Sequence, residues 1–518
     1  MTARKLVLTL GVALASAVLG HAQAMRTERH AFALAASQRL DLLDAWLAAT
    51  PERRRAAAAS AAKPNDGNPY LTLAEARAAL AGSAAPAVPE ILRASLAVFA
   101  LPEVCDGERF PAVHVTLHAP RGLPVAIDGL AFDLELVDGA GEIVASATLG
   151  DAVGNDDLMR FRATAPLAFS SAAPGRFEVR VFARAAAFAR TSIAISPVLL
   201  EPGFPARADA LPMLLDGSAL RVASADAIVA ALPEAQRSGP GLVLLRALVH
   251  DVERAYSGEP RRPGADPQRD LARAEAALEA LRADRDPWSD LRGRVTVSVP
   301  IGEFAGRQGE LVDFALVSID CGKDGLAQLP QRPLVLVVPG VPAWSIDASR
   351  PASPQTLHPA WTVDALRRAG FDKDGRWHVA VMESPGRFRS ASGAVRDVLR
   401  GLRQRLPVDP ERIALVGERE GGYAVARAAL DEAGAVHGAV LVDGGAVTAA
   451  ELASREALQI AYAISVGHPA QASLVAMAKA AAATGRAQVL PDSGAPWCIA
   501  LGAHAASIAA FLQSRFAP

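Results

Sequence analysis

The sequence predicts an α/β fold for the C-terminal part of the chain, with an eight-stranded, mostly parallel sheet preceded by helical segments and a small all-β sandwich. Three observations indicate this. From residue 295 onward, continuous apolar runs alternate with helical stretches. Between residues 110 and 197 apolar residues recur at every second position, and the segments on either side of that region have helical spacing. Continuous apolar strands are buried on both faces, which is typical of a parallel sheet covered by helices.

The first 24 residues have the three regions of a secretory signal. Arg4 and Lys5 precede an apolar run over residues 6–19, and Ala-Gln-Ala at residues 22–24 resembles a cleavage site. An uncleaved anchor is the alternative, but this run is shorter than the roughly 20 apolar residues that span a bilayer. We therefore predict export to the periplasm or the extracellular space, with no transmembrane segment after removal of residues 1–24.

Residues 25–109 are predicted to form a helical N-terminal region. Leu40, Leu43 and Leu47 recur at helical spacing, and a Pro-Asn-Asp-Gly-Asn-Pro sequence at residues 64–69 interrupts the pattern. Three consecutive arginines, at residues 53–55, adjoin an alanine-rich helix. Such a short charge run usually forms a solvated helix face, so it does not indicate a nucleic-acid site.

Residues 110–200 are predicted to form a β-sandwich of the immunoglobulin type. Val113, Val115 and Leu117 alternate with polar residues, and an Asp-Gly-Ala-Gly sequence at 138–141 joins two such runs as a hairpin loop. His114 and His118 fall on one face of a strand. Because no third ligand stands beside them, we interpret them as surface residues rather than as a metal site.

A helical connector follows at residues 201–290, and residues 291–518 form the predicted α/β domain. Eight apolar runs predict its strands, at 295–299, 311–319, 334–338, 378–382, 413–416, 438–442, 461–466 and 487–490. Helices are predicted at 361–369, 393–406, 422–433, 471–484 and 502–515. A glycine-rich bend joins the first two strands, so we expect that pair to be antiparallel.

Composition and motifs exclude several classes of function. The 518 residues have a formal net charge of −2, so no overall field attracts nucleic acid or anionic lipid. The sequence has no phosphate-binding G-x-x-x-x-G-K, no dinucleotide-binding G-x-G-x-x-G after a strand and no H-E-x-x-H zinc helix. Cys105, Cys321 and Cys498 have neither zinc-site nor disulfide-framework spacing and are predicted to be small buried residues. We predict no cofactor and no metal.

The most informative segment, residues 412–423, has the pattern of a strand, a sharp turn and a helix. Gly417 and Gly421 flank Arg419 at two residues on each side, as the tight turn of a G-x-S-x-G nucleophile elbow requires. This frame, with the Val-Asp-Pro-Glu-Arg sequence that starts at Val408, resembles the α/β-hydrolase superfamily, in particular bacterial esterases of the dienelactone hydrolase, prolyl oligopeptidase and phospholipase/carboxylesterase type. The resemblance covers about residues 295–516 and implies an α/β-hydrolase fold there.

The resemblance also implies where a catalytic triad would lie, and none of its members is present. Arg419 stands in place of the serine, Ala470 in place of the acid after the seventh strand, and Ala495 in place of the histidine after the eighth. A guanidinium remains protonated and cannot attack a carbonyl, so the usual acyl-enzyme route is closed. We therefore predict no catalytic residue at these degenerate positions, while His468 and Asp492 lie near them.

The same resemblance implies a candidate pocket around the elbow. The loop after the third strand would supply oxyanion donors, but Pro342 has no N–H. The loop at residues 384–390 resembles a rim loop of those esterases. The candidate pocket residues are Gly340, Val341, Arg387, Glu418, Arg419, Glu420 and Trp497.

Two roles remain open for Arg419. It either pairs with Glu383, Glu418 or Glu420 and fills the former pocket, or it binds a carboxylate or phosphate at the N-terminus of the following helix.

Three functions are consistent with the sequence. The first is an exported pseudohydrolase that uses its fold for binding or assembly, with a small anionic ligand or a protein as partner. The second is a carboxylesterase or peptidase with relocated catalytic residues, for which the candidates are Ser384, Ser390, Ser465 and Ser493 with His468 or His504. The third is a structural envelope protein whose sandwich makes the contacts.

Overall fold

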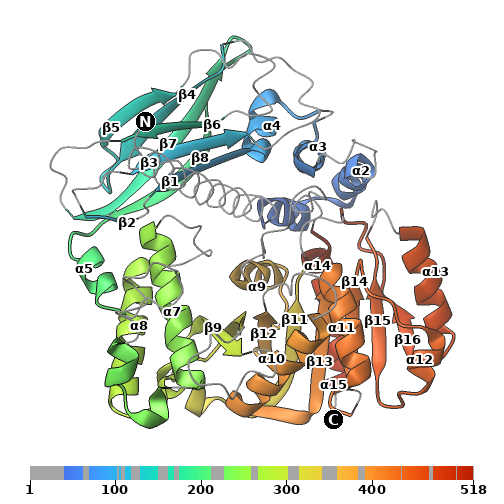
Figure 1. The fold of residues 1–518 in the computed structure, drawn as a ribbon. Helices are drawn as coiled ribbons and strands as arrows, with labels where there is room; N and C mark the ends of the chain where they lie inside the picture. The colour runs from blue at the N-terminus through green and yellow to red at the C-terminus, as the bar shows by residue number, and fades with distance from the viewer. Residues whose placement is uncertain are drawn as a thin grey trace, which may run out of the picture.

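The C-terminal part of the chain forms the predicted eight-stranded sheet (Figure 1). This computed structural model describes residues 40–61, 69–83, 85–101, 104–106, 111–117, 129–149, 162–167, 174–211, 227–237, 239–257, 266–300, 314–340, 359–382, 391–432, 434–465, 471–496 and 499–516. The strands are β9 (Arg294–Pro300), β10 (Phe314–Asp320), β11 (Arg332–Val338), β12 (His378–Met382), β13 (Val408–Glu418), β14 (Gly438–Val442), β15 (Gln459–Ala463) and β16 (Ala487–Val489).

The strand order of this sheet is β16-β15-β14-β13-β11-β12-β10-β9. β10 is antiparallel to both β9 and β12, and the other neighbouring pairs are parallel. The predicted fold class is thus confirmed, including the antiparallel opening pair. All eight predicted apolar runs overlap strands of this sheet; central strands such as β11 and β14 are buried on both faces, whereas β16 at the sheet edge is largely exposed.

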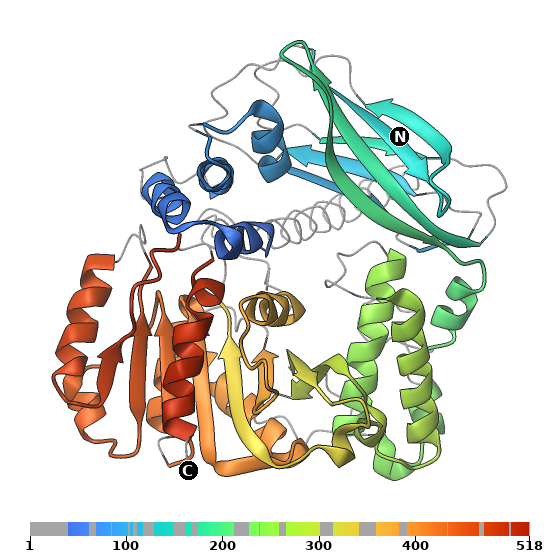
Figure 2. The same cartoon turned by 180° about the vertical axis from the view of Figure 1, so that it is seen from behind.

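Helices cover both faces of the sheet, and β11 shows how its residues divide between them. Leu334 and Leu336 belong to the same apolar cluster as α7 (Pro240–Ser257), α8 (Pro267–Arg282), α10 (Ala391–Arg405), α11 (Glu420–Asp431) and α13 (Gln471–Ala482). Val335 and Val337 point to the opposite face, which α9 (Pro359–Arg368), α14 (Ala500–Ala503) and α15 (Ala505–Phe516) cover (Figure 2). A short helix, α12 (Ala449–Ala453), follows β14.

The region between the all-β part and the eight-stranded sheet is helical in its described residues. α5 (Phe204–Asp209), a helical segment at residues 227–231 and the paired helices α7 and α8 precede β9. α7 and α8 pack into the same core as the sheet. Asp266 caps α8 by accepting hydrogen bonds from the backbone N–H groups of Gln268 and Arg269.

The all-β part contains two sheets. One has the order β1-β3-β6, formed by β1 (Leu96–Leu101), β3 (Ala112–Leu117) and β6 (Arg162–Pro166). The other has the order β2-β8-β7-β4-β5, formed by β2 (Val104–Cys105), β4 (Ala131–Val137), β5 (Ile143–Leu149), β7 (Gly175–Ala185) and β8 (Phe188–Leu200). β1 and β2 lie within residues 25–109, which we expected to be helical. The apolar sequence Leu-Ala-Val-Phe-Ala-Leu fits a strand here because β3 supplies a partner along its whole length.

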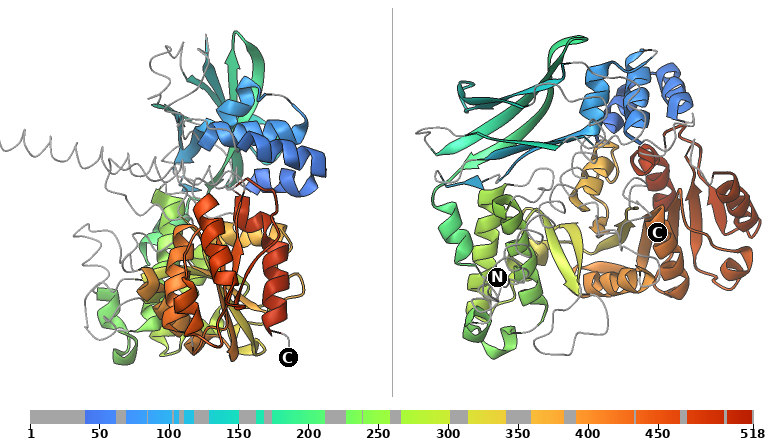
Figure 3. Two further views of the ribbon diagram at one scale, coloured as in Figure 1. Left: turned by 90° about the vertical axis from the view of Figure 1, so that its right-hand side faces the viewer. Right: turned by 45° about the horizontal axis from the view of Figure 1, so that its top comes forward.

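The first N-terminal helices lie beside the C-terminal domain, whereas the last of them packs on β8 of the all-β part (Figure 3). Residues 40–48 are helical, followed by α2 (Pro51–Ala61), α3 (Pro69–Ala81) and α4 (Val88–Ser95). Leu42, Leu43 and Trp46 form an apolar cluster with α2, α3 and the segment that precedes α14. Within the described parts of the chain, we find no helix with the length and apolar content of a membrane span.

Candidate functional site

The predicted elbow is present between β13 and α11. β13 ends at Glu418, α11 begins at Glu420, and Arg419 between them has φ 50° and ψ −114°. A residue other than glycine rarely adopts a positive φ, because its Cβ then crowds the backbone. Arg419 therefore has the strained conformation that a nucleophile elbow imposes on its central residue.

The glycines around this turn are required by close backbone approaches. A Cβ on Gly417 would lie 2.6 Å from the carbonyl oxygen of Gly421, and a Cβ on Gly421 would collide with the carbonyl oxygen of Val338. A Cβ on Gly340 would lie 2.6 Å from the carbonyl oxygen of Glu418 and 2.8 Å from the Cβ of Arg419. Gly340, after β11, thus contacts the elbow directly.

Arg419 is buried beside a carboxylate that the sequence analysis did not single out. Only 5% of Arg419 is exposed, and its backbone N–H donates to Val442 at 2.8 Å. Asp443, which follows β14, is 2% exposed. Burial raises the pKa of the Asp443 carboxyl, although the hydrogen bonds from Ser465 and the positive charge of Arg419 oppose that shift. An Asp directly after an apolar strand was the signal that could have identified it.

Ser465, one of the alternative nucleophiles, is bound to this carboxylate. Its backbone N–H donates to Asp443 Oδ1 at 2.6 Å, and its hydroxyl donates to Asp443 Oδ2. Ser465 is fully buried. The hydroxyl proton of Ser465 therefore points to the Asp443 carboxylate, which also accepts the backbone N–H of Ser465. It does not point to an imidazole that could serve as a general base.

A second alternative, Ser493 with His504, does form a hydrogen-bonded pair. The Oγ atom of Ser493 lies 3.1 Å from Nε2 of His504 and also accepts a hydrogen bond from the backbone N–H of Ala495 at 3.2 Å. Burial lowers the pKa of the His504 imidazole, while the carboxylates of Asp443 and Asp492 oppose this. The imidazole is therefore neutral near pH 7, as a general base must be.

The Ser493–His504 pair lacks the carboxylate that would orient the imidazole. Nδ1 of His504 is buried and has no hydrogen-bond partner within the described residues. The buried carboxylate of Asp443 influences the pKa of His504 through its charge, but it accepts its hydrogen bonds from Ser465. A serine triad needs this third group to fix the tautomer and stabilise the imidazolium.

The N-terminal helix covers the segment in which the triad histidine was expected. Ala495 is fully buried and belongs to the cluster formed by Leu42, Leu43 and Trp46. A Cβ on Gly502 would lie 2.6 Å from Cδ2 of Leu43, so the two segments are in direct contact. A ligand could reach Ala495 only if this helix moved.

Some of the candidate residues from the sequence lie together, and others lie outside the described residues. Gly340, Glu418, Arg419 and Glu420 lie together, since Glu420 Oε2 is 3.1 Å from where a Cβ on Gly340 would lie. Several candidates lie outside the described residues, namely Val341, Glu383, Ser384, Arg387, Ser390, His468, Ala470, Trp497 and Cys498.

We find no group of three or more metal-binding side chains among the described residues. Cys105 and Cys321 are buried, and burial raises the pKa of each thiol to about 12. His114 lies on β3, whereas His118 is outside the described residues.

No protein-family model and no curated protein matches the sequence. Similar solved structures include Est1E from Butyrivibrio proteoclasticus, at 10% identity over 43% of this chain and 99% of that chain with a TM-score of 0.31. A CIB-like hydrolase from Thermoplasma acidophilum is 13% identical over 43% of this chain and 100% of that chain, with a TM-score of 0.30. A thermostable esterase is 10% identical over 81% of this chain and 99% of that chain, with a TM-score of 0.35. Because these TM-scores are low, the fold is assigned from the strand order of the sheet and the geometry of the elbow, not from the similarity to these structures.

Proposed function

We propose that this chain, whose C-terminal domain has the α/β-hydrolase fold, is an exported protein that binds a small anion or a protein partner and does not hydrolyse esters. The observation that carries the proposal is the buried arginine at the nucleophile position of the elbow. Acyl transfer at this position needs an attacking oxygen or sulfur, and a guanidinium supplies neither.

The surroundings of Arg419 support a structural role for its charge. A buried cation is costly unless a negative charge lies nearby, and Asp443 provides one at the end of the neighbouring strand. The elbow and the loop at Gly340 leave little room between them, because a single added Cβ would lie within 2.8 Å of Arg419. These contacts favour a filled former pocket over an anion site at Arg419.

A panel of p-nitrophenyl esters, from acetate to octanoate, tests the loss of hydrolysis. We expect the purified full chain to release p-nitrophenol no faster than heat-unfolded protein at the same concentration. An active serine esterase serves as the positive control for the assay. Saturable turnover at an ordinary enzymatic rate would show that the proposal is wrong.

The contact between Ser493 and His504 favours a second candidate function, a hydrolase with relocated residues. In that mechanism His504 would accept the proton of Ser493 as the hydroxyl attacks a carbonyl. A fluorophosphonate probe distinguishes the two proposals. Labelling of the wild type that Ser493→Ala abolishes would support the hydrolase, and an absence of labelling in both proteins would support the binding protein.

Export is proposed from residues 1–24 and is tested separately. We expect expression in a Gram-negative host to yield periplasmic protein whose N-terminus begins at Met25, because the signal would be cleaved after Ala24. Recovery of the chain from the cytoplasm alone, with residues 1–24 intact, would contradict export.

A further inference from the structure

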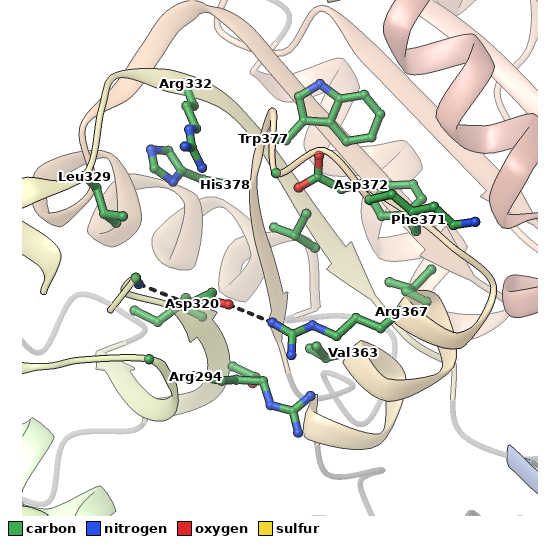
Figure 4. A pocket seen from close by; sticks show the side chains of 18 of the residues that line it. Arg294, Asp320, Leu329, Arg332, Val363, Arg367, Phe371, Asp372, Trp377 and His378 are labelled. Atoms are coloured by element: carbon green, nitrogen blue, oxygen red, sulfur yellow. Dashed lines mark hydrogen bonds and ion pairs between the residues drawn. The ribbon is translucent and has the colours of Figure 1, made fainter. Parts of the chain in front are cut away.

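A cavity of about 630 Å³ lies at the edge of the sheet opposite the elbow. Arg332, the first residue of β11, pairs with Val408, the first residue of β13, whereas Val338 at the other end of β11 pairs with Gly417 beside the elbow. The cavity is lined by Arg332 and by His378, the first residue of β12, together with parts of β9, β10 and α9 (Figure 4). It is therefore a separate site from the former catalytic centre.

Positive charge predominates in this cavity. Five cationic side chains line it, against two carboxylates, Asp320 and Asp372; the cations are Arg294, Lys323, Arg332, Arg367 and Lys373. The chain as a whole has a formal net charge of −2, so this excess is local. His378 does not add to it, because burial lowers the pKa of its imidazole and Nε2 lies 3.1 Å from the carbonyl oxygen of Pro330.

Two of the five cations are engaged by carboxylates, and three are available to a ligand. Arg367 binds Asp320 at 2.6 Å, and Arg294 binds Asp364 at 2.5 Å. Within the described residues, the side chains of Lys323, Arg332 and Lys373 form no ion pair or hydrogen bond.

The carboxylates of the cavity are occupied by protein donors. Asp320 accepts hydrogen bonds from Arg367 and from the backbone N–H of Gly322 at 3.0 Å. Asp372 accepts a hydrogen bond from the backbone N–H of Arg376 at 2.7 Å, and the positive charge of Arg332 favours the ionised form of its carboxyl. Neither carboxylate therefore neutralises the two lysines.

The remaining wall is apolar. Leu329, Val363, Phe371 and Trp377 line it, and Figure 4 shows Phe371 and Trp377 on the same side as Asp372. A cavity of this volume is in the range that holds small organic ligands, roughly 300–1,000 Å³. An apolar wall beside unneutralised cations suits a ligand with an apolar body and an anionic group.

We propose that this cavity binds a small organic anion, with a phosphate or carboxylate held by Arg332, Lys323 and Lys373 and an apolar body against Phe371 and Trp377. Arginine offers a planar fork of donors to either group, and the exposed lysines add charge at the entrance. This proposal is independent of ester hydrolysis, because the cavity is at the sheet edge away from Arg419.

Isothermal titration calorimetry on the full chain with four probes tests the proposal. 1-Naphthyl phosphate and 1-naphthoate carry the two anionic groups on the same ring system, 1-naphthol lacks the charge, and inorganic phosphate lacks the ring. We expect at least one of the two naphthyl anions to bind at least about tenfold more tightly than both 1-naphthol and inorganic phosphate, and the tighter of them to identify the anionic group. Equal binding of 1-naphthol, or no binding of either naphthyl anion at millimolar concentration, would overturn the proposal.

Variants show whether the ligand occupies this cavity. Arg332→Gln and the double variant Lys323→Gln/Lys373→Gln should each weaken the tighter anion about tenfold or more, since each removes a charged donor. Arg455→Gln and Lys479→Gln remove exposed cations elsewhere on the domain and should leave affinity unchanged. Circular dichroism verifies that all variants are folded. Unchanged affinity in both cavity variants would place the ligand elsewhere and refute the assignment.

Discussion

The buried imidazole of His504 should make the protein lose stability on mild acidification. Its pKa is lowered from the ordinary value of 6.5, and it is fully buried. Between its folded-state pKa and 6.5, the unfolded chain binds a proton that the folded chain does not, so the free energy of unfolding rises with pH across that window and falls as the pH is lowered.

The size of this effect follows from the number of protons. One such group gives a limiting slope of about 1.4 kcal/mol per pH unit. The pKa of His378 is also lowered by burial, so its contribution has the same sign. Where the two windows overlap, the two histidines together contribute at most about 2.8 kcal/mol per pH unit, while the raised pKa values of the buried Asp443 and Asp372 carboxyls act with the opposite sign. His504→Gln should therefore lower the wild-type slope by up to about 1.4 kcal/mol per pH unit.

Urea unfolding followed by circular dichroism between pH 5 and pH 8 measures these slopes. Ser493→Ala is the matched control, because it removes the hydroxyl next to Nε2 but keeps the imidazole buried. Its slope should resemble that of the wild type. A His504→Gln variant with the full wild-type slope would refute the reasoning.

Three further predictions concern the elbow and its cover. Gly421→Ala should prevent folding or lower the melting temperature sharply, because the new methyl group would collide with a backbone carbonyl oxygen of β11. Gly434→Ala is the control: its Cβ would meet nothing within 4 Å, so the free energy of unfolding should change by less than about 0.5 kcal/mol. Leu43→Ala should cost about 2–5 kcal/mol in urea unfolding, since Leu43 is 2% exposed, whereas Leu47→Ala, at a site 37% exposed, should have little effect. Arg419→Ser should not gain p-nitrophenyl acetate hydrolysis, because the expected histidine position is still an alanine; measurable turnover would contradict this.

The parts of the fold that local pattern determines were predictable. The central strands are the clearest case: nearly every residue of β11 and β14 and the second half of β13, residues 413–418, is buried, so continuous apolar runs carry the signal by themselves. The elbow was predictable for a similar reason. A side chain at Gly417 would collide with the backbone of Gly421, and one at Gly421 would collide with the backbone of β11. Glycine in the sequence marks places where two backbone segments approach this closely.

The contacts that define the environment of Arg419 were not predictable, because they join residues far apart in the chain. Asp443 and Ser465 follow different strands and meet only when those strands lie side by side. Sequence alone therefore points to the nearby Glu383, Glu418 and Glu420 as partners of Arg419 and gives no indication of Asp443. The opposite cavity draws cations from residues 294 to 373, and no single stretch of sequence shows that they share a space.

The contact of Leu43 with Gly502 has a consequence for how the molecule assembles. Residues 40–48 can pack on α2 and α3 soon after synthesis, but Gly502 lies about 460 residues after Leu43 in the chain. Closing so long a loop is entropically slow, and such distant contacts tend to form late. We infer that residues 40–48, together with α2 and α3, make their contact with the segment before α14 among the final steps of folding.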